Sequence, residues 1–196
     1  MISNMQIGVL ALQGDFAEHI SVLRRIGVQA IEVRFAEQLE EIDGLIIPGG
    51  ESTTLGKLAV DFKIIEPLRI FGQQKAIWGT CAGAIFLSKD ARREQPLLNL
   101  MDITVERNAF GRQVDSFEVA LDIPILTEVD PVDHPYHAVF IRAPLIEAVH
   151  GDARILAKLD DGRIVAAQEG RWLATSFHPE LTNDDRFHRY FIKLAA

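Results

Sequence analysis

Short apolar runs alternate with amphipathic segments through the first half of the chain. Runs of mostly apolar residues, which indicate buried strands, lie at residues 6–12, 28–33, 44–48 and 75–78. Between them, apolar positions recur at helical spacing at residues 16–26, 52–60 and 64–71. Ser52 is placed to cap the second of these helices. Strands that alternate with helices predict a parallel sheet covered by helices on both faces.

The pattern changes after about Leu87, where strands begin to dominate. Strands are indicated at residues 101–105, 116–121, 139–141 and 172–177, and an Asp-Gly turn predicts a hairpin of residues 155–159 and 163–168. A closing helix is predicted at residues 184–194. We expect one α/β domain over residues 1–196, a three-layer sandwich. Its central sheet is mostly parallel with helices on both faces, and the second half contains an antiparallel portion.

The composition excludes several classes of function. The 196 residues carry a net charge of −8, which argues against nucleic acid as a main partner. A single cysteine rules out an internal disulfide and fits a reducing cytosol. The first residues lack the charged start and apolar run of a signal peptide, and no apolar stretch approaches the roughly 20 residues that span a bilayer. We therefore expect a cytoplasmic protein that binds neither membranes nor nucleic acid.

The single cysteine, Cys81, lies where a predicted strand turns into a helix. Gly79 and Gly83 flank it in a Gly-x-Cys-x-Gly turn, which is the layout of a nucleophile elbow with cysteine in place of serine. Small residues are needed on both sides because the nucleophile of such a turn has a strained backbone. A helix N-terminus there would also favour the thiolate form. The alternative, on this turn alone, is an inert buried cysteine.

A cysteine nucleophile needs a base, and the base needs a group that orients it. His178 follows the last predicted strand, in the run Ser-Phe-His-Pro-Glu at residues 176–180. Residues two apart in an extended segment point the same way, and Pro179 restricts His178 to extended conformations. Glu180 is therefore expected to lie beside the His178 ring and to fix its tautomer. The alternative interpretation of this run is an ordinary ion pair on a surface turn.

Acyl transfer also needs hydrogen-bond donors for the developing oxyanion. Gly49 and Gly50 follow a predicted strand, where their N–H groups can turn into a pocket. The N–H of Ala82, directly after the nucleophile, is the other natural donor. Arg107 and Arg142 are each candidates to bind a substrate carboxylate, with surface ion pairs as the alternative.

These motifs resemble those of the glutaminase subunits of pyridoxal 5′-phosphate synthase, a branch of the class I (triad) glutamine amidotransferases. The cysteine turn and the His-Pro-Glu run are typical of the wider superfamily. The Gly-Gly-Glu-Ser-Thr-Thr and Arg-Asn-x-Phe-Gly-Arg-Gln runs are typical of this branch. Matching stretches occur in order over nearly the whole chain, at residues 8–14, 44–54, 79–83, 107–113, 141–144 and 176–182. At the second position after Gly83, many other triad amidotransferases carry glutamine, whereas this chain has Ile85, in agreement with the vitamin B6 branch.

The resemblance implies a class I glutamine amidotransferase-like fold and a catalytic triad of Cys81, His178 and Glu180. It also implies that glutamine is contacted by Gly50, Glu51, Ser52, Arg107, Ile141 and Arg142. Gly50 and Ala82 would supply the oxyanion donors, with Gln13 near them. No metal and no organic cofactor are expected. His134 and His137 lie in a run whose prolines are typical of an exposed loop rather than of a metal site.

The implied activity is hydrolysis of L-glutamine to L-glutamate and ammonia through a glutamyl thioester. The implied partner, in a hetero-oligomer, is a synthase subunit with a (β/α)8 barrel that uses the ammonia to make pyridoxal 5′-phosphate. Two other interpretations are open. One is a stand-alone cysteine hydrolase of the γ-glutamyl hydrolase or DJ-1/PfpI type, and the other is a non-catalytic regulatory or scaffold subunit. The complete set of cysteine, histidine and glutamate speaks against the second.

Overall fold

A computed structural model of the chain describes residues 5–107, 116–132 and 134–196. Strands and helices alternate in the first half: β1 (Gln6–Leu10), α1 (Phe16–Arg25), β2 (Gln29–Val33), the 3-10 helix η1 (Ala36–Glu41), β3 (Gly44–Ile47), α2 (Ser52–Asp61), α3 (Ile65–Gln74), β4 (Ala76–Thr80) and α4 (Ala82–Leu87). Within the described residues, no helix combines the length and the apolar character that crossing a bilayer requires.

The second half consists mainly of strands. Its elements are β5 (Ser88–Asp90), β6 (Met101–Glu106), β7 (Ser116–Leu121), η2 (Pro124–Glu128), β8 (Tyr136–Ile141), β9 (Leu145–Val149), β10 (Arg154–Lys158), β11 (Ile164–Glu169), β12 (Trp172–Thr175), η3 (Pro179–Leu181) and α5 (Arg186–Ala195). Every predicted strand and helix is present, with shifts at the ends. β5, β9 and the 3-10 helices have no counterpart in the sequence prediction.

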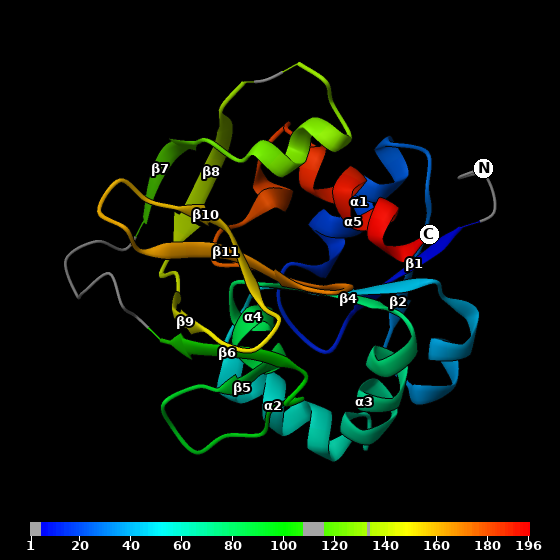
Figure 1. Cartoon of the computed structure of the whole chain (residues 1–196). Helices are drawn as coiled ribbons and strands as arrows, with labels where there is room; N and C mark the ends of the chain where they lie inside the picture. The colour runs from blue at the N-terminus through cyan, green and yellow to red at the C-terminus, as the bar shows by residue number, and fades with distance from the viewer. Residues whose placement is uncertain (1–4, 108–115, 133) are drawn as a thin grey trace.

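Among the described residues, ten strands form one mixed sheet, in the order β2-β1-β3-β4-β12-β11-β9-β6-β5 with β10 paired to β11 (Figure 1). Pairing is parallel from β2 through β12. It becomes antiparallel where β11 joins β12 and β9. The predicted α/β fold, parallel first and antiparallel later, is confirmed.

The position of β12 matters most for the site. This strand comes near the C-terminus yet pairs in parallel with β4, and Thr175 lies opposite Thr80. The chain therefore leaves both strands at the same edge of the sheet, where ligands bind in open α/β folds. Cys81 follows β4 and His178 follows β12, so two residues far apart in sequence reach one place.

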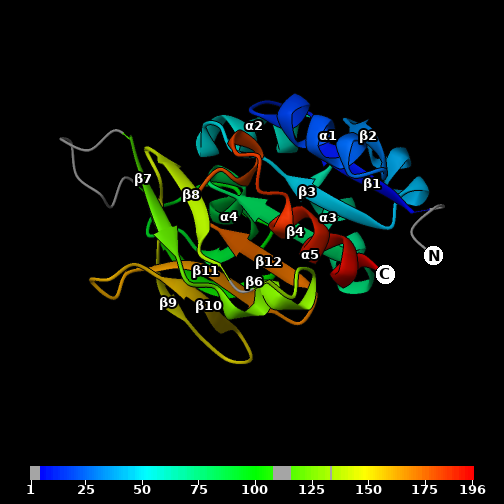
Figure 2. The same ribbon diagram turned by 90° about the horizontal axis from the view of Figure 1, so that it is seen from above.

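A separate antiparallel pair, β7 and β8, stands at one end of the molecule. Figure 2 shows this pair on the side away from β1 and the end of α5. The backbone N–H of His178 donates to the carbonyl oxygen of Val139 in β8 at 2.8 Å. The pair thus flanks the segment that carries His178.

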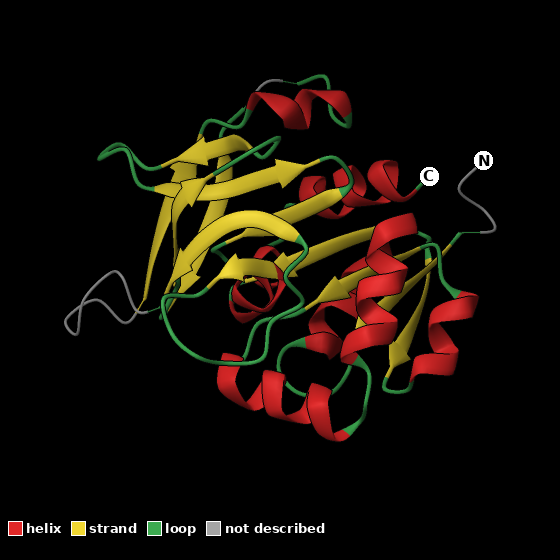
Figure 3. Cartoon of the chain, turned by 60° about the horizontal axis from the view of Figure 1, so that its bottom comes forward, coloured by secondary structure: helices red, strands yellow, loops and turns green. Residues whose placement is uncertain are grey.

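Helices cover both faces of the sheet (Figure 3). On one face, Leu23 of α1 and Phe191 of α5 are buried in a cluster with Trp78 of β4. On the other face, Leu68 of α3 belongs to a cluster with Ile77 of β4. Adjacent residues of β4 point to opposite faces, as the period of a strand requires. The predicted three-layer arrangement is therefore present.

The cap of α2 differs from the prediction. Ser52 is already the first helical residue, and the N-cap is Glu51, whose carboxylate accepts hydrogen bonds from the N–H groups of Thr53 at 3.2 Å and Thr54 at 2.7 Å. Glu51 takes this position because its backbone is extended and its longer side chain folds back over the first turn. The buried Ser52 hydroxyl makes no hydrogen bond with any described residue.

Candidate active site

Cys81 occupies the sharp turn between β4 and α4. Its backbone has φ 49° and ψ −110°, a region that residues other than glycine rarely adopt. A Cβ at Gly79 would collide with the carbonyl of Gly83, and a Cβ at Gly83 would collide with the carbonyl of Ile47. Both glycines are therefore required by close backbone packing. The N–H of Cys81 donates to the carbonyl of Thr175 at 2.8 Å, which fixes the turn to β12.

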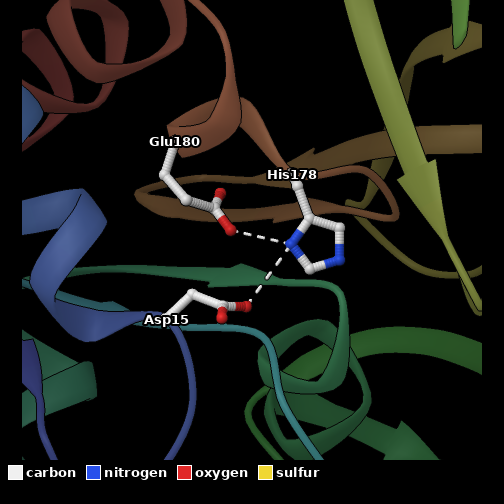
Figure 4. A group of neighbouring side chains, drawn as sticks. All are labelled: Asp15, His178 and Glu180. Carbon is white, nitrogen blue, oxygen red and sulfur yellow. Dashed lines mark hydrogen bonds and ion pairs between the residues drawn. The ribbon is translucent and has the colours of Figure 1, made fainter.

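The ring of His178 is held from one side by Glu180. Nδ1 of His178 lies 2.7 Å from Oε1 of Glu180, and the two residues are 4% and 6% exposed (Figure 4). The predicted pairing is present, but the reason differs from the one expected. Pro179 starts the 3-10 helix η3, so a tight turn, rather than continued extension of the strand, brings Glu180 back to the ring.

The protonation of this pair is set by opposing effects. Burial by itself would lower the pKa of His178, but contacts with Cys81 and Glu180 raise it to about 10. Burial would raise the pKa of Glu180, whereas the neighbouring rings of His19 and His178, the latter through a hydrogen bond as well, lower it overall. An imidazolium held by a carboxylate is therefore favoured. Because Nδ1 is engaged by Glu180, Nε2 is the nitrogen available to Cys81.

A second carboxylate, Asp15, approaches the same nitrogen. Its Oδ2 lies 3.6 Å from Nδ1 of His178 (Figure 4). The polar atoms of Asp15, His178 and Glu180 all lie within 4.8 Å of one another, a spacing that requires comparison with that of metal ligands. Ligands of a tetrahedral zinc would be about 3.3 Å apart, however, given bonds of about 2.0 Å. The 2.7 Å separation of Nδ1 and Oε1 fits a direct hydrogen bond better than a metal centre.

A cavity of about 360 Å³ opens beside Cys81 and His178. All six predicted glutamine contacts line it, together with the predicted donor Ala82: Gly50, Glu51, Ser52, Arg107, Ile141 and Arg142. Asp15, Ile85, Pro144 and Leu181 complete the lining. The buried, unpartnered hydroxyl of Ser52 belongs to this wall, so it has hydrogen-bonding capacity for a ligand.

One wall of the cavity is a loop supported from behind. Oε1 of Gln13 accepts a hydrogen bond from the N–H of Glu51 at 2.9 Å, and Nε2 of Gln13 donates to the carbonyl of Gly49 at 3.5 Å. Gly50 has φ 137°, and a Cβ there would collide with Gln13. Among the described residues that line the cavity, Gln13 is absent; it supports the loop, and its part at the oxyanion stays a prediction.

Arg107, which follows β6, reaches the start of α2. It lies 2.9 Å from Oε1 of Glu51 and donates to the hydroxyl of Thr53 at 3.0 Å. Partial burial acts to raise the pKa of Glu51, but the hydrogen bonds from Thr54 and Thr53, followed by the charge of Arg107, lower it to about 2. The rest of the run that Arg107 begins, residues 108–113, lies outside the described residues.

Sequence reasoning missed two buried histidines behind Glu180. His19 of α1 and His188 of α5 are both 0% exposed. Nε2 of His19 lies 3.3 Å from Oε2 of Glu180. The available signal was a histidine next to Ile20 on the apolar stripe of a helix, which is more often a satisfied core residue than part of a site.

Comparison with known proteins shows which family the chain belongs to. The model of the SNO glutamine amidotransferase family matches residues 9–196. The chain is 57% identical to the pyridoxal 5′-phosphate synthase subunit PdxT of Herpetosiphon aurantiacus, over 97% of this chain and 100% of that protein. It is 55% identical to the protein of the same name from Moorella thermoacetica, over 97% and 99%.

The fold agrees with a solved structure. A crystal structure described as a glutamine amidotransferase superposes with a TM-score of 0.89 at 49% identity, covering 96% of this chain and 98% of that one. The class I glutamine amidotransferase-like fold implied by the sequence is thereby confirmed. With the family match over nearly its whole length, the chain belongs to the SNO glutamine amidotransferase family.

Proposed function

We propose that this chain is the glutaminase subunit of a pyridoxal 5′-phosphate synthase and hydrolyses L-glutamine to L-glutamate and ammonia. One observation carries the proposal: Cys81 and His178 line the same cavity, and Glu180 is hydrogen-bonded to the far side of the histidine ring. Family membership and the names of the similar proteins support it. A match that begins at residue 9 and reaches residue 196 supports a single glutaminase domain.

The chemistry follows from the two ends of the His178 ring. The Cys81 sulfur attacks the carbon of the glutamine side-chain amide, and the N–H groups of Gly50 and Ala82 are the proposed donors to the oxyanion. The C–N bond then breaks as Nε2 of His178, protonated because of its raised pKa, gives its proton to the departing nitrogen. Ammonia leaves, and a γ-glutamyl thioester remains on Cys81.

The second half of the reaction releases glutamate. His178, now neutral, accepts a proton from a water molecule whose oxygen attacks the thioester carbon. The C–S bond breaks, the thiolate of Cys81 is restored, and the imidazolium of His178 is formed again beside Glu180. The carboxylate of Glu180 stabilises that imidazolium and keeps Nδ1 protonated throughout. Every proton taken up in one half is returned in the other.

The proposal also includes a partner subunit that uses the ammonia. A subunit name in the similar proteins implies a second, synthase subunit, which we propose is a (β/α)8 barrel that receives ammonia through a protected path. The loop at Gly49 and Gly50 is held by Gln13 in the isolated chain. Docking of the synthase is proposed to realign this loop, so that ammonia release rises when the partner is added. The open alternatives, a stand-alone hydrolase and a scaffold, gain no support from these relatives.

The decisive test compares wild type with Cys81→Ala, each with and without the synthase subunit. Wild type should release ammonia from glutamine, faster with the synthase, and Cys81→Ala should lose at least about 1,000-fold in rate with its fold intact. An electrophilic diazoketone analogue of glutamine should label Cys81 only in the wild type. Unlabelled Cys81 in the complex, together with no ammonia release, would refute the proposal. Equal rates with and without the synthase would refute the gating.

A further inference from the structure

A buried chain of polar groups continues behind the triad. Nδ1 of His19 lies 3.0 Å from Nε2 of His188, so a ring from α1 is joined to a ring from α5. Both rings are completely excluded from solvent. Burying a polar group is costly unless it is hydrogen-bonded, so these two enclosed rings depend on their contacts with each other and with their polar neighbours.

The other nitrogen of His19 contacts both the strand that ends at the nucleophile and the carboxylate that orients the base. Nε2 lies 3.3 Å from Oγ1 of Thr80 and 3.3 Å from Oε2 of Glu180. Thr80 directly precedes the nucleophile Cys81, and Glu180 holds the base. A single imidazole thus touches the strand that presents the sulfur and the carboxylate that orients His178. Oε2 of Glu180 makes no hydrogen bond with any described residue, and Nε2 of His19 lies 3.3 Å from it as a close polar neighbour.

The proton positions in this chain follow from its chemistry. Burial lowers the pKa of His19, and burial lowers that of His188 well below its ordinary value, so each ring is neutral and carries one proton. A carboxylate only accepts, so the proton of His19 belongs on Nε2, between Glu180 and Thr80. Nδ1 of His19 then accepts from Nε2–H of His188. Nδ1 of His188 is left bare, in agreement with its having no partner among the described residues.

The rings are also held by packing. Trp78 of β4 meets His19 edge-on, with ring centroids 5.7 Å apart and planes at 77°, and meets His188 at 5.0 Å and 74°. The indole N–H of Trp78 donates to Oγ1 of Thr175 at 3.2 Å, which fixes the indole between β4 and β12. Because Trp78 belongs to the strand that ends at Cys81, rotation of either histidine would disturb the same strand.

We propose that His19 is a positioning residue for the reaction. Its ring holds Glu180 and Thr80 in place, so that the base His178 and the nucleophile Cys81 keep their relative geometry, and His188 supports the ring of His19. The inference rests on the proposed glutaminase function, because the residue acts only through groups assigned there. His19 does not touch the cavity; it acts through the Glu180 carboxylate and the turn at Cys81.

The ionisable groups around Glu180, His19 and His188 determine how the reaction rate should depend on pH. The ionisable groups coupled to Glu180, His19 or His188 come from the start of α1 and α1 itself, from β8, from the segment after β12 and from α5: Asp15, Glu18, Arg25, Tyr136, His178 and the two histidines themselves. Replacing His19 by an apolar residue removes the polar ring that lies 3.3 Å from the buried Glu180 carboxylate, so the carboxylate becomes harder to ionise. The acidic limb of the pH–rate profile should then move to higher pH, because that limb reports loss of the Glu180 anion.

The test uses the complex with the synthase and three variants. His19→Leu should lower kcat for glutamine by about 10- to 100-fold, the size typical of groups that orient a reacting residue, with little change in KM. The acidic limb should move upward at the same time. His19→Gln, whose amide nitrogen can take the place of Nε2, should recover most of kcat and the wild-type profile. His188→Leu should give a smaller loss of the same kind.

Matched controls separate positioning from folding. His150 also contacts a threonine hydroxyl, Oγ1 of Thr104 at 3.3 Å, but it lies after β9 outside the site, so His150→Leu should leave kcat and the pH profile unchanged. A wild-type kcat and profile in His19→Leu would overturn the proposal. So would His19→Gln and His19→Leu that are equally slow and equally lowered in melting temperature, since that pattern indicates a purely structural role.

A spectroscopic reading keeps the two proposals distinguishable. If the wild-type complex released no ammonia, the proposed function would fail, but NMR titration of the His178 ring would still report on positioning. In His19→Leu, the pKa of His178 should fall relative to wild type, because a less firmly held Glu180 stabilises the imidazolium less. An unchanged His178 titration would overturn the positioning role, whatever the activity. His19→Gln serves the same measurement if the leucine variant does not fold.

Discussion

The two sides of the His178 ring lie in very different surroundings. On the cavity side are the Cys81 sulfur, a loop with a positive φ at Gly50 and the unpartnered hydroxyl of Ser52. On the buried side, the ring is bonded to Glu180, which in turn contacts His19 within the closed core. The polar groups of one side face a cavity that a substrate can enter, whereas those of the other side are enclosed in the core and contact one another.

This difference separates the cavity wall, which must adapt to a ligand or partner, from the buried side of the ring, which must keep its geometry. The cavity wall is held by side-chain bonds to a loop backbone, such as those of Gln13, which can be exchanged at small cost when a ligand or partner arrives. The buried side is fixed by elements of the sheet and by helices α1 and α5. An oriented base is useful only if its orientation survives binding, so rigidity is placed behind His178 and adaptability in front of it.

The largest expected effect is a loss of kcat on replacing Glu180, the central residue of the buried side. Glu180→Gln removes the charge that stabilises the imidazolium, so kcat should fall on the order of 1,000-fold with a smaller change in KM. The pKa of His178, now about 10, should fall as well. Steady-state kinetics of the synthase complex and NMR titration of the ring measure both effects. Glu180→Asp, which keeps the charge, should retain more activity; a glutamine variant within tenfold of wild type would contradict the comparison.

The same pair predicts a pH dependence of stability. The folded pKa of His178 lies above its ordinary 6.5, so its contribution to stability is complete below about pH 6.5 and is lost as the pH rises toward 10. In Glu180→Gln this loss should be smaller. Urea unfolding at pH 6 and pH 9 measures the difference.

The sequence predicted the reacting residues well because their chemistry is encoded locally. Gly79 and Gly83 are needed within one turn of Cys81, and Glu180 is two residues from His178. One short motif therefore reveals the nucleophile, and another reveals the base with its orienting carboxylate. Their convergence depends on β12 pairing with β4, which no local pattern encodes. It was reached through the family resemblance rather than through residue spacing.

What sequence reasoning missed depends on tertiary contacts. Glu51, rather than Ser52, is the N-cap of α2, and its carboxylate also contacts Arg107, which directly follows β6. His19 becomes part of the site only because α5 brings His188 against it. The roles of Glu51 and His19 depend on partners that are distant in the chain. The sequence pattern alone predicted Ser52 as the cap and gave no indication of a role for His19.

A smaller effect is expected on the cavity side, at Glu51. Its pKa of about 2 lies below the ordinary 4.5, so its contribution to stability is present above pH 4.5 and is lost as the pH falls toward 2. The side chain is 46% exposed, so solvent screens much of this contribution. Glu51→Gln should lower the free energy of unfolding by about 0.5–1 kcal/mol at pH 7 and by almost nothing near pH 2.

Urea unfolding of wild type and Glu51→Gln across this pH range tests the cap. Glu66→Gln is the matched control, because Glu66 is an exposed first-turn glutamate of α3 paired with Arg69 at 3.3 Å. Its difference from wild type should be smaller at pH 7. A Glu51→Gln penalty that stays constant down to pH 2 would show that the charge of Glu51 does not hold the start of α2.

The smallest effect concerns Asp15, which lies on the border between the two sides. Burial and the charge of Glu180 raise its pKa, although His178 acts in the opposite direction. A carboxyl whose folded pKa is raised stabilises the fold at low pH and loses that contribution as the pH rises through its pKa. Folding therefore disfavours the ionised form of Asp15 relative to the unfolded chain. Asp15 makes no side-chain bond that caps α1, so an amide sacrifices nothing there.

Asp15→Asn should accordingly raise the free energy of unfolding at pH 7 by less than about 1 kcal/mol, since the side chain is 40% exposed, and should change it little below pH 3. Glu18→Gln is the comparison with the opposite expected sign. Glu18 lies in the first turn of α1, where a negative charge is favourable, so its loss should lower the free energy of unfolding by about 0.3 kcal/mol. Thermal and urea unfolding of both variants at pH 7 decide the matter. Destabilisation by Asp15→Asn would mean that attraction to the His178 imidazolium outweighs burial, and Asp15 would then belong with Glu180 on the rigid side of the ring.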